Sequence, residues 1–146
     1  MEIVSAGGVV YRETRDGGEI VVCGRFDTKS HHLPKGTPEP GETREETALR
    51  EVREETGLNV EILRFVGEIN YLIQCFGSGE KLKKTVFFYL MKSTGGDFSL
   101  HDEEFDFAKW VKVSEIVNTL TYINEVHIVQ KSLSLVKSGS GRASQC

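Results

Sequence analysis

Residues 36–58 read GTPEPGETREETALREVREETGL, and this stretch decides the fold of the chain. Thr43, followed three residues later by Glu46, forms a capping box, which predicts the start of a helix. Gly57 stands where a helix C-terminal glycine belongs. Residues 44–56 contain no Pro or Gly and are rich in helix formers, so the sequence predicts one helix over this span.

Three carboxylates of this helix are expected to lie close together. At about 100° per residue, Glu51, Glu54 and Glu55 fall within about a quarter of the helix circumference, beside the apolar face that packs on the core. Like charges at this spacing repel by roughly 0.2–0.5 kcal/mol per pair, and a bound dication reverses that repulsion. Because Mg²⁺ prefers hard oxygen ligands, the helix predicts a metal site.

The alternative interpretation is a solvated, glutamate-rich helix face. The loop at 36–41, with two prolines and two glycines, argues against it, because this loop returns the chain into the helix. Lys35 and backbone carbonyls are then placed beside the carboxylates. Arg50 lies four residues from both Glu46 and Glu54, so it can pair with each and orient Glu54.

The spacing of the whole stretch matches a known family. Gly36 is followed after five residues by Glu42, and after seven more by the run REVREETGL at 50–58. Every fixed position of the Nudix box is filled, so the chain closely resembles the Nudix hydrolases. The resemblance implies metal-dependent cleavage of a diphosphate attached to another group. It also implies an α/β (α+β) fold, an α/β/α sandwich with a mixed sheet.

Charge is concentrated in the same stretch. Segment 36–58 carries seven acidic and three basic residues, a net charge of −4, which equals the net charge of the whole chain. The remainder is therefore neutral and offers no general basic surface. This distribution suits a multi-ion cation site and makes duplex nucleic acid an unfavourable partner.

The rest of the composition bounds the class of protein. A chain of 146 residues is expected to form a single domain, here 1–137, followed by a flexible, polar tail at 138–146. No apolar run is long enough for a bilayer, and the N-terminus lacks a signal-peptide pattern, so no membrane partner is expected. The three cysteines have no CxxC spacing and predict reduced thiols in a cytoplasmic protein. Monomer and homodimer both stay open.

The periodicity of apolar residues predicts the remaining elements. Strands are expected over 3–12, 19–25, 60–75, 82–92 and 105–113. A short helix capped by Ser114 is expected over 114–119, and a core-packing helix over 122–136.

Motifs outside the box resemble the diadenosine tetraphosphate hydrolases. They are the segment 31–42 (HHLPKGTPEPGE), the pair Asn70-Tyr71 and the run Lys84-Thr85-Val86. The resemblance covers roughly residues 3–136. Within several Nudix enzymes a glutamate lies six residues before a strand tryptophan, as Glu104 does before Trp110. One departure is Ala108, where some members of the group place an aromatic residue that can lie against adenine.

These resemblances imply roles for particular residues. The expected ligands of two or three Mg²⁺ ions, or of Mn²⁺, are Glu51, Glu54, Glu55, Glu104 and the carbonyl of Lys35. Glu54 is the first candidate for the base that takes a proton from the attacking water and Glu104 the second, with Arg50 orienting Glu54. The expected substrate contacts are Lys35, Gly36, Lys83, Lys84 and Tyr71. Alternatively, the strand lysines are ordinary solvated strand ends and Tyr71 belongs to the core.

The leading hypothesis from the sequence is hydrolysis of diadenosine tetraphosphate to ATP and AMP. The alternatives are a nucleoside triphosphate pyrophosphohydrolase that removes oxidised or surplus nucleotides, and an enzyme that removes pyrophosphate from RNA 5′ ends. From a different class, the chain could be a non-catalytic Nudix-fold sensor of a nucleotide. The complete box argues against the sensor, since such modules usually lose box glutamates.

Overall fold

The computed structural model describes residues 2–75 and 77–145, with side chains described as far as residue 137. Within these residues seven strands form one sheet, in the order β3-β2-β1-β6-β5, with β4 paired to β1 and β7 paired to β2. The strands are β1 (Glu2–Thr14), β2 (Gly17–Gly24), β3 (His31–His32), β4 (Lys35–Gly36), β5 (Leu58–Gln74), β6 (Lys81–Gly96) and β7 (Phe107–Lys112). The pair β1–β6 is parallel and the others are antiparallel, so the expected mixed sheet is confirmed.

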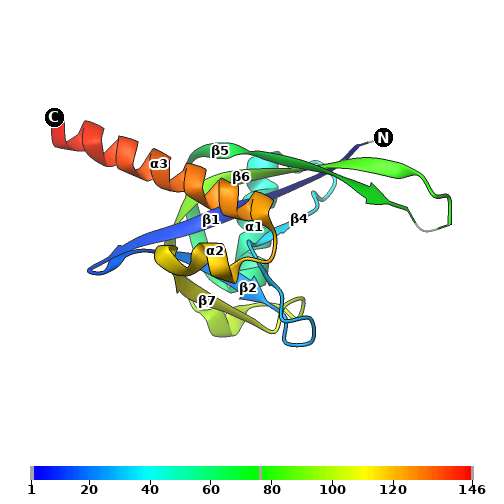
Figure 1. Cartoon of the computed structure of the whole chain (residues 1–146), viewed down its shortest axis with the longest axis horizontal. Coiled ribbons are helices and arrows are strands. Elements are labelled where there is room, and N and C mark those ends of the chain that lie inside the picture. The colour runs from blue at the N-terminus through cyan, green and yellow to red at the C-terminus, as the bar shows by residue number, and fades with distance from the viewer. Residues whose placement is uncertain (1, 76, 146) are drawn as a thin grey trace.

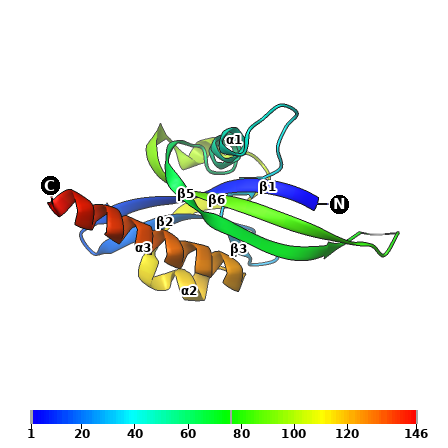
Figure 2. The ribbon, with the colours of Figure 1, turned by 90° about the horizontal axis from the view of Figure 1, so that it is seen from above.

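Helices cover both faces of this sheet (Figures 1 and 2). The α-helices are α1 (Arg44–Thr56), α2 (Ile116–Thr119) and α3 (Ile123–Gln145), and the 3₁₀ turns are η1 (Phe98–Leu100) and η2 (Val113–Glu115). Figure 2 shows α1 above the sheet and α2 with α3 below it. The expected α/β/α sandwich is therefore confirmed.

Two hydrophobic clusters hold the layers together. One lies under α3 and includes Val126 and Val129, and the other lies under α1 and includes Ala48 and Val52. Neighbouring residues of β1 alternate between them, because successive strand side chains point to opposite faces. Each cluster buries its side chains almost completely, which places the strands between two dry layers.

Local sequence signals form α1 as expected. Thr43 Oγ1 accepts from the Glu46 N–H at 3.1 Å, and Glu46 Oε1 accepts from the Thr43 N–H at 2.9 Å. At the other end Gly57 adopts φ 80°, and its N–H donates to the Arg53 carbonyl at 2.8 Å. A side chain at Gly57 would overlap the carbonyl oxygen of Asp97, so the position requires glycine for space as well as for conformation.

Some expected boundaries were wrong. Ser114 lies inside the turn η2 and does not cap α2, whose N-cap is Glu115, because the chain first makes a 3₁₀ turn after β7. The α3 backbone also continues past the expected end at 136, as far as Gln145. The side chains of the proposed tail, residues 138–146, lie outside those that the structure describes. The domain limit at 137 therefore stays a prediction.

Two further sequence expectations concern environment. Cys23 and Cys75 are free thiols, and Cys146 lies outside the described residues. In the described part of the chain, no helix combines the length and the apolar character needed to cross a membrane.

Candidate metal centre and substrate cleft

Three carboxylates meet at the end of α1. Glu51, Glu55 and Glu104 each offer an oxygen, and these oxygens all lie within 4.8 Å of one another. Glu51 and Glu55 are one helical turn apart on α1, whereas Glu104 comes from the segment between η1 and β7. The fold thus brings a third carboxylate to a pair that the helix already sets side by side.

Burial makes this group of acids costly without a cation. Glu55 is 1% exposed, and its burial, followed by hydrogen bonding with Glu104, raises its pKa to about 9. Burial also raises the pKa of Glu51. A dication would offset this repulsion, because an opposite charge favours the ionised form of each carboxylate. The carboxylate oxygens of this group, two of them on buried side chains, therefore fit a hard metal ion.

The backbone at Lys35 and Gly36 lies directly against the three acids. The Lys35 N–H donates to Glu55 Oε1 at 2.9 Å. A Cβ on Gly36 would overlap Glu51 Oε2, so only glycine leaves room for that carboxylate. The close approach of the Glu51 carboxylate to the backbone thus explains why the first residue of the box is glycine. The same segment, β4, is held in place by its pairing with β1.

Arg50 ties the loop to the helix. It donates from Nε to Glu42 Oε2 at 2.7 Å, and from Nη1 to Glu51 Oε1 at 2.5 Å and Glu54 Oε2 at 3.2 Å. The expected pair with Glu54 is confirmed. The expected pair with Glu46 is wrong, because that carboxylate accepts from the helix-capping Thr43 N–H. Hydrogen bonding to Arg50 lowers the pKa of Glu42 to about 2.

Glu54 is not part of the group of three. Its side chain is 44% exposed, is held by Arg50, and lines a separate hollow together with Asp102. The Asp102 N–H donates to the Glu54 carbonyl at 2.7 Å, which ties the Glu104 segment to the end of α1. The role of Glu54 as ligand or base stays a prediction.

A cleft of about 740 Å³ leads away from Glu55 and Glu104 toward the start of α3. Its polar lining includes Arg25, Lys35 and Glu125. Arg25 Nη2 lies 3.9 Å from Glu104 Oε1 at the acidic end. A negatively charged ligand entering the cleft would therefore meet two cationic side chains beside the carboxylates.

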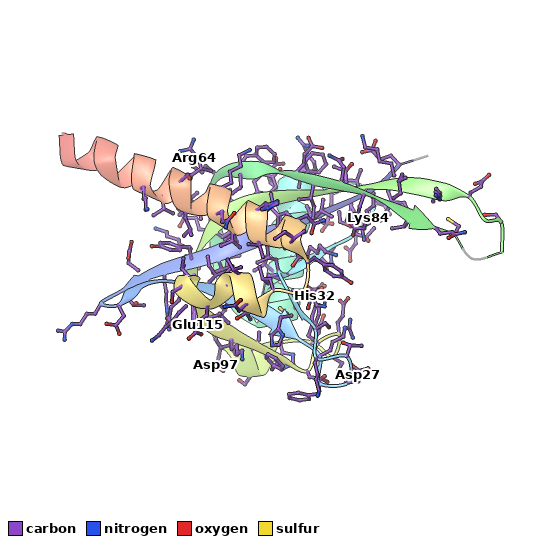
Figure 3. All side chains as sticks on the ribbon, viewed as in Figure 1. Asp27, His32, Arg64, Lys84, Asp97 and Glu115 are labelled. Carbon is purple, nitrogen blue, oxygen red and sulfur yellow. The ribbon has the colours of Figure 1, made fainter. Side chains whose placement is uncertain are left out.

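Aromatic rings form one wall of the cleft. The ring of His32 lies 5.8 Å from that of Phe105 and 5.5 Å from that of Tyr122, measured between centroids. Tyr71 also lines the cleft, and Lys84 Nζ lies 6.0 Å from its ring centroid. In Figure 3, His32 and Lys84 are both drawn near the amino-terminal end of α3.

The two strand lysines face opposite ways. Lys84 pairs with Tyr71 across β5 and β6, and burial, followed by the charge of Lys35, lowers its pKa. Lys83 is exposed and points to the other face of the sheet, because strand side chains alternate. The structure therefore brings Lys84 to the cleft side and leaves Lys83 away from it.

Sequence reasoning missed several polar residues of the cleft, among them Arg25, Asn124 and Glu125. Glu125 is 2% exposed, accepts from the Leu33 N–H at 2.9 Å, and has a pKa raised to about 7 by burial. Asn124 Oδ1 is buried and has no hydrogen-bond partner in the described part of the chain. An acid on the apolar face of the helix at 122–136 was the signal that could have found Glu125.

The position of the expected departure, Ala108, is 8% exposed and belongs to the hydrophobic cluster under α1. Trp110 packs against the same cluster, with the Arg12 guanidinium 4.0 Å from its ring centroid. The rings available to a ligand in the cleft therefore belong to other residues, namely His32, Tyr71, Phe105 and Tyr122.

The profile of the NUDIX domain matches residues 1–131. The chain belongs to the Nudix family. It is 37% identical over 138 residues to the putative mutator protein MutT4 of Mycobacterium tuberculosis, covering 90% of this chain and 55% of that protein. It is 32% identical over 136 residues to the 8-oxo-(d)GTP phosphatase of Mycolicibacterium smegmatis, covering 87% of this chain and 40% of that protein.

This Nudix chain thus spans about half the length of the curated relatives that it matches. Among solved structures, the Ap4A hydrolase of C. elegans superposes with a TM-score of 0.67 at 18% identity, covering 93% of this chain and 99% of that one. At this identity the likeness shows the fold alone.

Proposed function

We propose that this Nudix protein is a metal-dependent pyrophosphohydrolase of a purine nucleoside triphosphate, with an oxidised guanine nucleotide as the first candidate. The observation that carries the proposal is the cleft itself, which is lined by aromatic rings and by Glu55 and Glu104, two of the three grouped carboxylates. A polyphosphate at the acidic end and a base among the rings would occupy it together. The mycobacterial relatives named as a mutator protein and an 8-oxo-(d)GTP phosphatase support this choice.

The polar groups beside the rings favour a base with N–H donors. Asn124 Oδ1 is buried without a partner among the described residues, and a buried acceptor of this kind needs a donor. A guanine edge offers adjacent N1–H and N2–H groups, and 8-oxoguanine adds N7–H. Tyr122 and His32 supply faces against which the base can stack.

The acidic end would hold the metal. Glu51, Glu55 and Glu104 are the proposed side-chain ligands of two or three Mg²⁺ ions, with Mn²⁺ as a substitute, and the Lys35 carbonyl is a further ligand. When bound, such ions neutralise phosphate charge and lower the pKa of an attacking water. Arg25 and Lys35 line the cleft next to these acids and would hold the non-reacting phosphates.

Proton removal from water needs a carboxylate that is ionised and reachable. Glu54 is the first candidate, because Arg50 holds its carboxylate at 3.2 Å and its side chain stays 44% exposed. Glu104 is the second candidate, because it lies in the group of three. Arg50 would act by orienting Glu54.

Diadenosine tetraphosphate is the second candidate substrate, with ATP and AMP as products. The specific observation in its favour is Lys84, which lies beside Tyr71 and can neutralise a longer polyphosphate. The fold likeness to the C. elegans Ap4A hydrolase is consistent with it and adds no specificity. A cytoplasmic location stays a prediction from the cysteine pattern.

The test is a Mg²⁺-dependent panel in oxygen-18 water, with products identified by chromatography. It contains 8-oxo-dGTP, dGTP, dATP, diadenosine tetraphosphate and 5′-triphosphorylated RNA. Pyrophosphate from the guanine nucleotides at the highest kcat/KM supports the proposal. ATP plus AMP from diadenosine tetraphosphate at higher efficiency would replace it with the second candidate, and release of pyrophosphate from RNA alone would replace both. No Mg²⁺-dependent product from any substrate would favour the nucleotide sensor.

A further inference from the structure

The segment 31–35 connects the two helical layers through alternate backbone amides. The His31 N–H donates to Thr121 Oγ1 at 2.8 Å, and the Leu33 N–H donates to Glu125 Oε1 at 2.9 Å. The Lys35 N–H donates to Glu55 Oε1 at 2.9 Å. We call residues 31–35 the strap.

The acceptors of the strap come from opposite faces of the sheet. Thr121 and Glu125 lie at the start of α3, on one face, while Glu55 lies on α1, on the other (Figure 2). Glu125 and Glu55 are both almost fully buried, at 2% and 1% exposure. The strap therefore donates hydrogen bonds to two buried carboxylates, one of which is a proposed metal ligand.

The sheet also holds both ends of the strap, because β3 pairs with β2 at one end and Lys35 of β4 pairs with β1 at the other. Pro34 has no N–H, and its carbonyl accepts from the Gly8 N–H of β1 at 3.2 Å. Leu33 is fully buried, so its N–H must find a partner inside the protein, and Glu125 is that partner. Loss of this acceptor would leave a buried donor unsatisfied two residues from Lys35, which is the amide that orients Glu55.

We propose that Glu125 is a positioning residue of the metal centre. It acts through Leu33 and Lys35 and sets the carboxylate of Glu55 at the angle that ions require. In this role Glu125 touches neither the ions nor the phosphates. The inference rests on the metal centre of the proposed function and is independent of which nucleotide is cleaved.

Three variants separate this role from simple packing. Glu125→Leu removes the acceptor of the Leu33 N–H, whereas Glu125→Gln keeps an acceptor oxygen in the same place. Ser132→Ala is the matched control, because Ser132 is fully buried on the same helix and donates only within it, to the Ile128 carbonyl at 2.9 Å. Loss of the Ser132 hydroxyl affects the packing of α3 but removes no hydrogen bond to the strap.

The primary measurement is calorimetric binding of Mn²⁺ and Mg²⁺ to the whole chain without nucleotide. Loss of a group that orients a metal ligand typically weakens metal affinity by about 10- to 100-fold. The loss of affinity in Glu125→Leu is expected to fall in that range. Glu125→Gln should stay within about 3-fold of wild type, because its oxygen still accepts from Leu33. Ser132→Ala should bind the ions like wild type even where its melting temperature is lower.

Kinetics on the best substrate of the panel give a second readout. Glu125→Leu should need about 10-fold more Mg²⁺ for half-maximal rate, whereas Ser132→Ala should keep the Mg²⁺ requirement of wild type. Where Glu125→Leu does not fold, Thr121→Val takes its place. It removes the acceptor of the His31 N–H and should weaken ion binding by about 3-fold, since it lies farther from Lys35.

Two results would overturn the proposal. Wild-type ion affinity in Glu125→Leu, or in Thr121→Val where that variant is used, would make the acceptors of the strap structural only. An equal loss in Glu125→Gln would show that the charge acts, and not the acceptor. Failure of the proposed function looks different, because wild type would then bind ions normally and cleave nothing in the panel. Absence of ion uptake by wild type would remove the metal centre and this inference together.

Discussion

Replacing Glu55 by Gln should stabilise the metal-free protein against unfolding at alkaline pH. The same replacement should remove most of the extra stability that Mg²⁺ gives to the wild-type protein. The Lys35 N–H donates to Glu55 Oε1, and the pKa of this carboxyl is raised from an ordinary value of 4.5 to about 9 by burial and by hydrogen bonding with Glu104. Gln has the shape of the protonated acid. Its oxygen can accept from Lys35 and its amide can donate to Glu104.

The sign follows from the raised pKa. The protonated Glu55 stabilises the fold fully below pH 4.5, and this contribution is lost as pH rises through about 9, because the unfolded chain ionises first. At pH 8, which is 3.5 pH units above the ordinary pKa of 4.5, keeping Glu55 protonated in the fold costs at most about 5 kcal/mol at about 1.4 kcal/mol per unit. Relaxation and water entry reduce such penalties, so a gain of about 2 kcal/mol is expected for Glu55→Gln.

The assay is urea unfolding of both proteins in EDTA at pH 5 and pH 8, repeated with saturating Mg²⁺. At pH 5 the two should differ by less than about 1 kcal/mol, because the wild-type carboxyl is then protonated at almost no cost. Mg²⁺ at 100 times its Kd should stabilise wild type by about 2.7 kcal/mol and the variant by far less. A metal-free variant that is weaker than wild type at pH 8, or one that gains as much from Mg²⁺, would refute the reasoning.

Three further predictions test the site. Gly36→Ala should lower kcat/KM by at least about 100-fold in the nucleotide assay, because its Cβ would overlap Glu51 Oε2 and displace a ligand; near-normal activity would exclude this contact. Glu54→Gln should lower kcat by about 10²- to 10⁴-fold with an unchanged melting temperature, and normal turnover would reject it as the base. Lys84→Ala should raise the KM for diadenosine tetraphosphate by about 10-fold, the loss of one favourable contact of about 1.4 kcal/mol. Lys83→Ala is the matched control and should leave that KM unchanged, since Lys83 points to the opposite face; equal effects would contradict this placement.

Local signals predicted the helix of the box almost residue by residue. The capping box at Thr43 and the glycine at Gly57 act within one helical turn, so their partners are visible in the sequence itself. The pairing of Arg50 with Glu54 followed from the same short-range geometry. The predicted pairing with Glu46 was wrong because that carboxylate accepts a hydrogen bond from the Thr43 N–H in the helix cap.

The sequence by itself determined that this is a Nudix chain with Glu51 and Glu55 one turn apart on a helix, because both facts depend on spacing along 23 residues. Only the tertiary structure showed that the Glu104 carboxylate lies with them while Glu54 lies outside this group, and that Lys84 is on the cleft side of the sheet while Lys83 is not. It also decided that the Leu33 and Lys35 amides, two residues apart, donate to the buried carboxylates of Glu125 and Glu55. Helical periodicity sets contacts within a turn, whereas contacts between distant segments depend on how the layers pack. The burial that raises the pKa of Glu55 belongs to those layers and to no stretch of sequence alone.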